Sequence, residues 1–372
     1  MADSRIGLPI TQLDTPCLLV DLDRLEANIH RMAAHAQSRG VGLRPHIKTH
    51  KIPAIAHMQM AAGAIGITTA KVSEAEVMAA AGMRDIFVAY PIVTALKARR
   101  VAALIRSGVR MIVGVESEVG ARTLAAAAQE AGVTIEVRVE VNTGLNRCGV
   151  APAATAELAR LVRALPGLDL DGIFTFRGGV FPGSGTRSIP DVGREEGEMM
   201  VALAVQLRAA GIPVRSVSVG STPTAPYCAV PGVTEIRPGT YVFNDNMQIA
   251  SETAGPEQVA LSILSTVVSR QAPDLATLDA GAKVFSGDVI PAAAGLNGYG
   301  RGFGGLDAVV ERMNEEHGVA RLGAGLNPKV GETMRLVPNH VCTSVNLSDE
   351  LIGIRDDRVE TVWAVVARGK RE

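Results

Sequence analysis

Aromatic residues and cysteines are both scarce in this chain. Phe, Trp and Tyr together make up 3 % of the 372 residues, so we expect a core built from aliphatic side chains. The four cysteines are widely separated and form no CxxC pair; they are Cys17, Cys148, Cys228 and Cys342. A chain of this size with scattered cysteines is not a disulfide scaffold, and we expect reduced thiols in a cytoplasmic protein.

An excess of charge of either sign is also missing, as are long hydrophobic runs. Lys and Arg number 37 against 38 Asp and Glu, which gives a formal net charge of -1. This balance gives no electrostatic reason to expect a nucleic-acid partner or a membrane surface. No apolar run approaches the roughly 18 residues that a membrane span requires, and no basic-then-apolar signal peptide opens the sequence.

The first two thirds of the chain alternate short β-branched runs with longer alanine-rich segments. The strand candidates are residues 41–46, 64–69, 85–90, 110–115, 135–141, 170–176, 214–220 and 233–239. Eight strands with intervening helices fit a (β/α)₈ TIM-type barrel better than an open doubly wound sheet. We therefore predict a barrel domain over residues 22–250.

After residue 251 the pattern changes to apolar runs separated by Gly and Pro turns. It predicts a smaller β-rich C-terminal domain over residues 251–372, with one helix near 306–318. Residues 1–21 can be assigned either to the barrel or to this second domain. A chain of 372 residues exceeds the usual size of one hydrophobic core, which agrees with two domains.

One lysine stands out in "RPHIKTHK", at the end of the first predicted barrel strand. A lysine at the apolar mouth of a barrel loses hydration, which lowers its pKa and suits Lys48 to Schiff-base chemistry. The alternative is an ordinary surface lysine. A metal site at His46 and His50 is less favoured, because no carboxylate or thiol lies beside them in the sequence.

Three other loops follow predicted barrel strands. "VSVGSTPT" (217–224) and "EIRPGTYVFND" (235–245) offer backbone N–H groups and short hydroxyls of the kind that bind phosphate. "EVNTGLNRCG" (140–149) directs Arg147 to the barrel mouth. The alternatives are ordinary turns and a loop ion pair.

A possible metal pair occurs in "PNHVCTSVNL" (338–347) of the second domain. His340 and Cys342 are separated by one residue, so on a strand they would share a face and could hold one divalent metal. The pattern alone also occurs by coincidence.

Taken in order, these segments cover nearly the whole chain. The sequence resembles the fold-type III pyridoxal-phosphate (PLP) enzymes of the D-threonine aldolase / D-serine dehydratase family, which are relatives of alanine racemase. The resemblance implies that Lys48 forms the Schiff base with PLP and that Arg147 approaches its phenolic oxygen. The implied phosphate ligands are Ser221, Thr222, Gly239 and Thr240, with Arg237 or Tyr241 near the ring.

The resemblance also implies a metal and a partner. His340 and Cys342 match the metal pair of this family. The thiolate favours Zn²⁺, Mn²⁺ activates some aldolases of the family, and Mg²⁺ is a third choice. The family works as homodimers whose active sites are completed by the partner subunit, on small D-amino acid substrates.

One departure concerns the loop after the sixth strand. Many relatives carry His and Tyr there, whereas residues 174–185 read "FTFRGGVFPGSG". The base would then be His317, a metal-bound water or Lys48 itself. Arg177 could bind an acidic substrate, and His46 would tune Lys48 from beside it.

The favoured function is therefore a PLP- and metal-dependent lyase of D-3-hydroxy-α-amino acids. D-Threonine aldolase comes first, with a D-serine or D-3-hydroxyaspartate dehydratase second. A racemase would need a second base, and none is evident. A non-catalytic PLP carrier is disfavoured because such carriers lack a second domain. A barrel without a cofactor is disfavoured because several candidate site segments fall at the expected ends of barrel strands.

Overall fold

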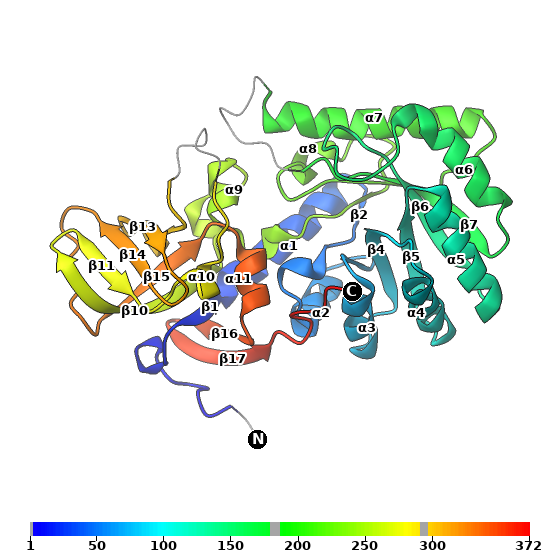
Figure 1. Cartoon of the computed structure of the whole chain (residues 1–372). Helices are drawn as coiled ribbons and strands as arrows, with labels where there is room; N and C mark the ends of the chain where they lie inside the picture. Colours follow the sequence, from blue (N-terminus) through cyan, green and yellow to red (C-terminus); the bar gives the residue numbers. More distant parts are fainter. Residues whose placement is uncertain (1–2, 179–186, 291–296) are drawn as a thin grey trace.

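The computed structural model describes residues 3–178, 187–290 and 297–372. Figure 1 shows two domains side by side, a barrel surrounded by helices and an antiparallel β domain. The predicted combination of a TIM-type barrel with a C-terminal β domain is confirmed.

The barrel is a sheet of eight parallel strands in the order β2-β9-β8-β7-β6-β5-β4-β3. Backbone bonds from Ile65 N to Leu43 O (2.9 Å) and from Thr68 N to Pro45 O (2.8 Å) join β3 to the β2 segment and close the ring. The strands are β2 (Gly42–Leu43), β3 (Ile67–Thr69), β4 (Asp85–Pro91), β5 (Arg110–Val115), β6 (Ile135–Glu140), β7 (Leu168–Phe174), β8 (Ser216–Val219) and β9 (Glu235–Ile236).

Helices cover the outside of this barrel (Figure 1). The sequence marks several of their ends: Asp21 caps α1 by accepting a bond from Arg24 N, and Gly132 ends α5 in the left-handed conformation. The helices are α1 (Leu22–Ser38), α2 (Pro53–Ala61), α3 (Val72–Ala80), α4 (Ala95–Arg106), α5 (Glu118–Ala131), α6 (Thr155–Ala164), α7 (Ile189–Ala209) and α8 (Ala225–Cys228). Helix α9 (Asn246–Ala250) follows the last barrel strand and contacts the second domain (Figure 1).

The barrel has two different cores. Between the sheet and its helices the packing is aliphatic, as the composition predicts. Inside the ring, however, lies a buried ionic network: Arg138 Nε is 2.7 Å from Asp171 Oδ2, and Arg44 Nε is 3.0 Å from Glu235 Oε2. The expectation of a wholly aliphatic core is therefore wrong, because paired and hydrogen-bonded charges can fill the ring.

The second domain is a nine-stranded sheet in the order β11-β14-β13-β12-β15-β10-β1-β16-β17, closed by an additional β10–β11 pairing. The N-terminal strand β1 (Cys17–Asp21) belongs to this sheet, antiparallel to β10 and parallel to β16. The other strands are β10 (Leu261–Ala272), β11 (Leu275–Leu278), β12 (Gly300–Gly302), β13 (Ala308–Met313), β14 (Gly318–Leu322), β15 (Thr333–Pro338), β16 (Glu350–Arg355) and β17 (Arg358–Ala364).

The prediction of a helix at residues 306–318 is wrong. This segment forms β13 and the turn into β14, which pair antiparallel with each other. Val309 and Val310 are β-branched and find strand partners on both sides, so sheet pairing overrides the helix-favouring Glu, Arg and Met that follow. In the part of the chain that the structure describes, no helix is long and apolar enough to cross a membrane.

Candidate functional site

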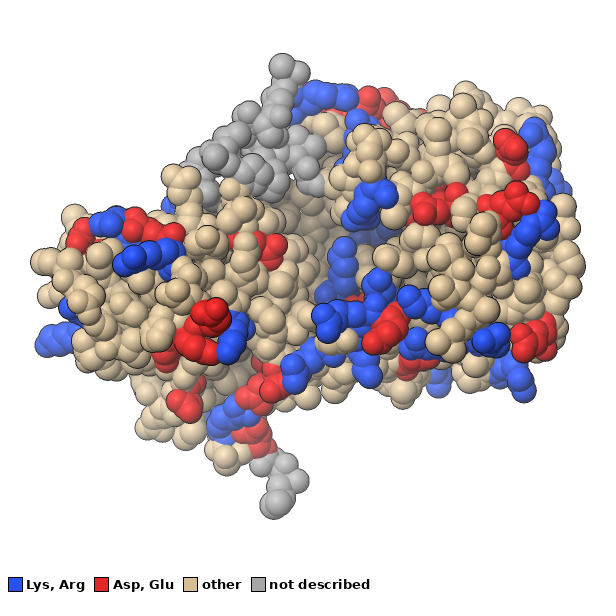
Figure 2. Space-filling view, in the orientation of Figure 1, with Lys and Arg blue, Asp and Glu red and all other residues tan. Residues whose placement is uncertain are grey.

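A cavity of about 270 Å³ lies at the carboxyl ends of the barrel strands, where the second domain meets the barrel. Figure 2 shows the hollow between the domains, with basic side chains along it. The cavity brings together nine residues selected from the sequence: His46, Lys48, Ser221, Thr222, Arg237, Gly239, Thr240, His340 and Cys342. Phe176, Pro223, Met247, Gln248 and Ser251 complete its lining.

Lys48 lies in a short 3₁₀ turn (Ile47–Thr49) that follows β2. Its ammonium nitrogen is 5.5 Å from the centroid of the Phe176 ring. Burial lowers the pKa of Lys48; the nearby Cys342 opposes this shift, and the positive charge of Arg147 adds to it. The amine is therefore more easily deprotonated than an ordinary lysine, as carbonyl chemistry requires.

The turn around Lys48 is fixed by its neighbours. His46 Nδ1 accepts a long bond from Lys48 N (3.4 Å), and burial, followed by the charge of Lys48, lowers the pKa of His46 well below 6.5. Lys51, which has a positive φ of 57°, forms a buried ion pair with Glu74 at 2.7 Å. These contacts leave Lys48 little freedom of backbone position.

The loops after β8 and β9 form one continuous polar surface. Thr222 Oγ1 accepts bonds from Gly239 N and Tyr241 N, both at 3.2 Å. A Cβ at Gly239 would lie 3.0 Å from His46 O, so the close approach of this loop to the lysine turn favours glycine. Short hydroxyls and backbone N–H groups thus converge on one wall of the cavity.

Of the two residues expected near the cofactor ring, Arg237 lines the cavity and Tyr241 does not. Arg237 Nε donates to Ser218 Oγ at 2.6 Å, and burial lowers the pKa of Arg237 to about 10. The Tyr241 hydroxyl instead accepts a bond from Gln59 Nε2 at 2.9 Å in the barrel wall.

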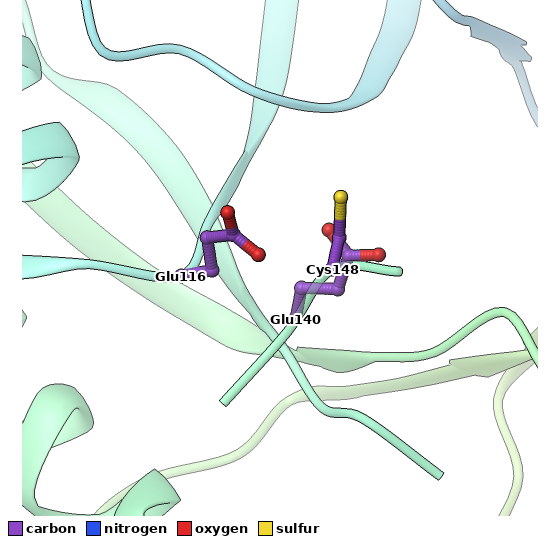
Figure 3. A group of neighbouring side chains, drawn as sticks. All are labelled: Glu116, Glu140 and Cys148. Atoms are coloured by element: carbon purple, nitrogen blue, oxygen red, sulfur yellow. The ribbon is translucent and has the colours of Figure 1, made fainter. Parts of the chain in front are cut away.

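Arg147 is exposed, and its guanidinium carbon is 4.8 Å from the centroid of the same Phe176 ring that Lys48 approaches. The next residue, Cys148, belongs to a cluster with Glu116 and Glu140 whose ligand atoms all lie within 4.8 Å of one another (Figure 3). Burial, and then the charge of Glu116, raise the pKa of Glu140 to about 7. Near neutral pH this buried carboxyl is therefore partly protonated.

His340 and Cys342 lie on the opposite wall. They do not share a strand face, as the sequence suggested: His340 is the N-cap of α11 (Val341–Leu347), and Cys342 lies in its first turn. The helix turn still directs both side chains into the cavity. Cys342 Sγ is 3.2 Å from Thr49 Oγ1, one residue after Lys48.

Asp245, fully buried at the N-terminus of α9, holds His340 in place. Its Oδ2 is 3.1 Å from His340 Nδ1 and also accepts a bond from Val341 N. Such a carboxylate on Nδ1 orients an imidazole so that Nε2 can bind a metal. The negative charge of Cys342 and the bond to Asp245 raise the pKa of His340 to about 11 against the effect of burial.

The Cys342 thiol has a lowered pKa. Burial would raise it, but the charge and hydrogen bond of His340, together with the charge of Lys48, outweigh burial. A thiolate and an imidazole converging from one helix turn are a suitable donor pair for a divalent metal such as Zn²⁺.

Four residues selected from the sequence do not line the cavity: Arg147 and Tyr241, described above, and also Arg177 and His317. Arg177 Nη2 forms an ion pair with Glu195 of α7 at 2.7 Å, and His317 is exposed in the turn between β13 and β14. The loop "FTFRGGVFPGSG" is described only as far as residue 178, so the rest of that expectation lies outside the described residues.

Sequence reasoning missed several supporting residues. Asp245, which contacts His340, ends the quoted segment 235–245 but was given no role there. Glu196, which accepts a bond from Gly220 N, lies in a predicted helix that showed no functional pattern. For Asp245, the only signal was its position five residues after Thr240, at the end of a phosphate-type loop. Tertiary proximity, which the sequence does not contain, was needed for both.

Comparison with known proteins agrees with this architecture. The family model described as "Alanine racemase, N-terminal domain" matches residues 20–247, and a serine dehydratase domain model matches residues 260–354. A D-threonine aldolase of Arthrobacter sp. is 37 % identical over 368 residues, covering 98 % of this chain and 95 % of its own.

Solved structures are similar over the same length. D-Threonine aldolase from Filomicrobium marinum has a TM-score of 0.88 at 34 % identity, with 100 % of both chains covered. D-threo-3-Hydroxyaspartate dehydratase from Delftia sp. HT23 has a TM-score of 0.86 at 33 % identity and covers 96 % of this chain and 98 % of its own. A cysteine-to-alanine mutant of D-threo-3-hydroxyaspartate dehydratase, described as metal-free, has a TM-score of 0.87 at 33 % identity. The chain therefore belongs to the alanine-racemase-like family of PLP enzymes that includes D-threonine aldolase and D-threo-3-hydroxyaspartate dehydratase.

Proposed function

We propose that this protein is a PLP- and metal-dependent lyase of D-3-hydroxy-α-amino acids, and that it cleaves D-threonine to glycine and acetaldehyde. The observation that carries the proposal is the cavity itself. It combines a lysine of lowered pKa with a histidine–cysteine pair on the facing wall, within one space of about 270 Å³.

The residues of the cavity fit the cofactor. Lys48 would hold its aldehyde, and Ser221, Thr222, Gly239 and Thr240 would hold its phosphate. Arg237 would lie at the ring, supported by its position in the cavity, with Tyr241 behind the wall. PLP supplies an electron sink for the carbanion that forms at the substrate α-carbon.

The facing wall fits a divalent metal. His340 and Cys342 would be its protein ligands, with Asp245 orienting the imidazole. A related D-threo-3-hydroxyaspartate dehydratase structure is described as being in a metal-free form, which supports a metal site in this family. Zn²⁺ is our first choice because a thiolate takes part, with Mn²⁺ and Mg²⁺ as alternatives; the metal supplies Lewis acidity toward the substrate hydroxyl.

Three side chains are candidates for the base that accepts a proton from the substrate: Lys48, His46 and His317. Lys48 would hold the cofactor, and the lowered pKa of its amine would suit it to accept a proton from the substrate. His46 is a poorer base, because burial holds its pKa far down and its Nδ1 faces Lys48 N. His317 is exposed in a turn of the second domain and would need the partner subunit to act.

The cavity favours a neutral substituent at the β-carbon. Arg177, the candidate for binding an acidic side chain, is paired with Glu195 at 2.7 Å. Phe176 and Met247 offer apolar contacts in the lining. These observations support D-threonine over D-3-hydroxyaspartate, because the arginine selected for an acidic substrate is already paired with a carboxylate.

The second candidate is a D-serine or D-3-hydroxyaspartate dehydratase. One observation favours it: Cys342 is close to the Lys48 turn, at 3.2 Å from Thr49 Oγ1. A metal held by His340 and Cys342 would supply Lewis acidity toward the substrate hydroxyl, and Lys48 would accept the α-proton.

Product analysis distinguishes the two reactions. The purified protein is incubated with D-threonine, D-serine and D-3-hydroxyaspartate. Glycine and acetaldehyde from D-threonine support the aldolase, whereas 2-oxobutanoate and ammonia would replace it with the dehydratase. Lys48→Ala should lose both the visible absorption of the cofactor and the activity.

Three further expectations remain proposals. We propose a homodimer with sites completed by the partner subunit, and a cytoplasmic location. We also propose domain limits of 22–250 and 251–372, with residues 1–21 joining the second domain; the pairing of β1 with β10 and β16 supports the last point.

A further inference from the structure

The loop that begins at Gly220 has a support that the sequence did not reveal. Helix α7 packs against this loop and α8 at very short range. A Cβ at Gly193 would lie 3.1 Å from Thr224 O, and a Cβ at Gly197 would lie 2.3 Å from Cys228 O. The two glycines, four residues apart on one helix face, allow this approach.

Glu196 lies between these glycines and is fully buried. Its Oε1 accepts a hydrogen bond from Gly220 N at 3.0 Å. Its Oε2 is buried and has no hydrogen-bond partner among the described residues. A carboxyl group this deep is costly, so a specific task for it is expected.

Gly220 is the point where the chain leaves β8 and turns. Its φ of +89° is in the left-handed region, and a Cβ there would lie 3.0 Å from Cys228 Sγ. Directly after it, Ser221 N donates to Thr224 Oγ1 at 2.9 Å, and the Ser221 and Thr224 hydroxyls are 3.0 Å apart. The direction of the Gly220 N–H therefore sets the start of this turn.

We propose that Glu196 is a positioning residue for the cofactor phosphate: it holds Gly220 so that the 220–224 turn presents Ser221 and Thr222 to that group. The proposal rests on the proposed PLP function. Glu196 itself does not line the cavity, so it acts through the turn.

The hydrogen bond, rather than a negative charge, is what this role requires of Glu196. Burial raises the pKa of Glu196, against the bonds from Gly220 and Thr224 and the charges of Arg237 and Arg177. An amide oxygen could accept the same Gly220 N–H. An amide should therefore replace it, and an aliphatic side chain should not.

The test compares Glu196→Leu with Glu196→Gln, and uses Glu198→Leu as the matched control because Glu198 is exposed on the same helix. Full-length proteins are titrated with PLP and with pyridoxal, which lacks the phosphate, and visible absorption reports binding. Glu196→Leu should weaken PLP about tenfold, the cost of one lost buried hydrogen bond, and change pyridoxal less than about twofold. Glu196→Gln and Glu198→Leu should bind both as the wild type does.

Two results would overturn the proposal: unchanged PLP affinity in folded Glu196→Leu, or an equal loss of PLP and pyridoxal, which would indicate a purely structural role. If Glu196→Leu does not fold, Thr224→Val is tested instead, because it removes the acceptor of Ser221 N. This variant should show the same phosphate-specific loss. A PLP affinity equal to that of the wild type would refute the proposal. A wild type that forms no coloured complex with PLP refutes the proposed function itself, so the two failures are distinguishable.

Discussion

Glu140 offers a stability prediction whose size follows from its surroundings. It ends β6 with 5 % of its surface exposed, and its carboxyl lies beside Glu116 and Cys148 (Figure 3). Burial, together with the Glu116 charge, raises the pKa of Glu140 from 4.5 to about 7, although Arg237 and Arg147 oppose the shift. Folding of the chain is therefore coupled to the uptake of a proton.

The sign and size follow from linkage. Because the folded-state pKa is above the unfolded value, the stability associated with protonated Glu140 is fully present below pH 4.5 and is lost as pH rises through about 7. The total is about 3 kcal/mol for a shift of this size. Between pH 5.5 and pH 8 the wild type should lose about 2 kcal/mol through this group.

Glu140→Gln keeps the shape of the side chain and removes its titration. Urea unfolding of the holoenzyme and the variant, with the same excess of cofactor, gives the free energy of unfolding at pH 5.5 and at pH 8. The advantage of the variant over the wild type should be about 2 kcal/mol larger at pH 8. The matched control is Glu118→Gln, an exposed carboxylate on α5, whose difference from wild type should be the same at both pH values.

The reasoning is refuted if the wild type and Glu140→Gln respond to pH in parallel. That result would mean that the carboxyl is ionised in the folded protein, because water or Arg147 stabilises its negative charge and offsets the hydration lost on burial. A pH response shared by Glu118→Gln would instead point to the overall charge of the chain.

Three further substitutions test other contacts. Asp245→Asn removes the charge that orients the His340 imidazole, the proposed metal ligand, and should weaken metal binding about ten- to a hundredfold, measured by competition with a chelating dye; an unchanged affinity would contradict this role. Lys51→Met leaves the buried Glu74 without its cation and should lower the free energy of unfolding by about 3 kcal/mol in urea, and a loss below 1 kcal/mol would show that the pair is dispensable. Tyr241→Phe removes the bond to Gln59 and should cost about 1 kcal/mol of stability with kcat/KM within about twofold of wild type, whereas a tenfold fall in kcat/KM would place the hydroxyl in the reaction.

The sequence predicted the barrel well because local pattern and fold agree there. The strand expected at 110–115 is β5 without change, and the others overlap their predicted ranges. The segment 306–318 failed because its composition favours a helix, whereas its two neighbours in the sheet supply the strand pairing. A preference set by distant strands cannot be seen in a local window.

The residues of the candidate site also divide into those that the sequence revealed and those that it did not. Residues in short, distinctive loops, such as Lys48 and His340, could be selected from the sequence, and the structure gathers most of them into one cavity. Asp245 and Glu196 could not be assigned roles, because they act through hydrogen bonds to residues 95 and 24 positions away. Arg177 was selected for its charge, which is paired with Glu195.

The ionic network inside the barrel has a consequence for engineering. Arg44, Arg138, Asp171 and Glu235 come from or adjoin four different strands, and each charge is matched only when those strands are in register. An apolar barrel interior can be repacked one residue at a time. In this barrel, replacing one member of the network leaves a buried charge without its partner. Redesign for new substrates should therefore begin with the apolar residues of the cavity lining, such as Met247, and should leave the ionic network intact or replace its members together.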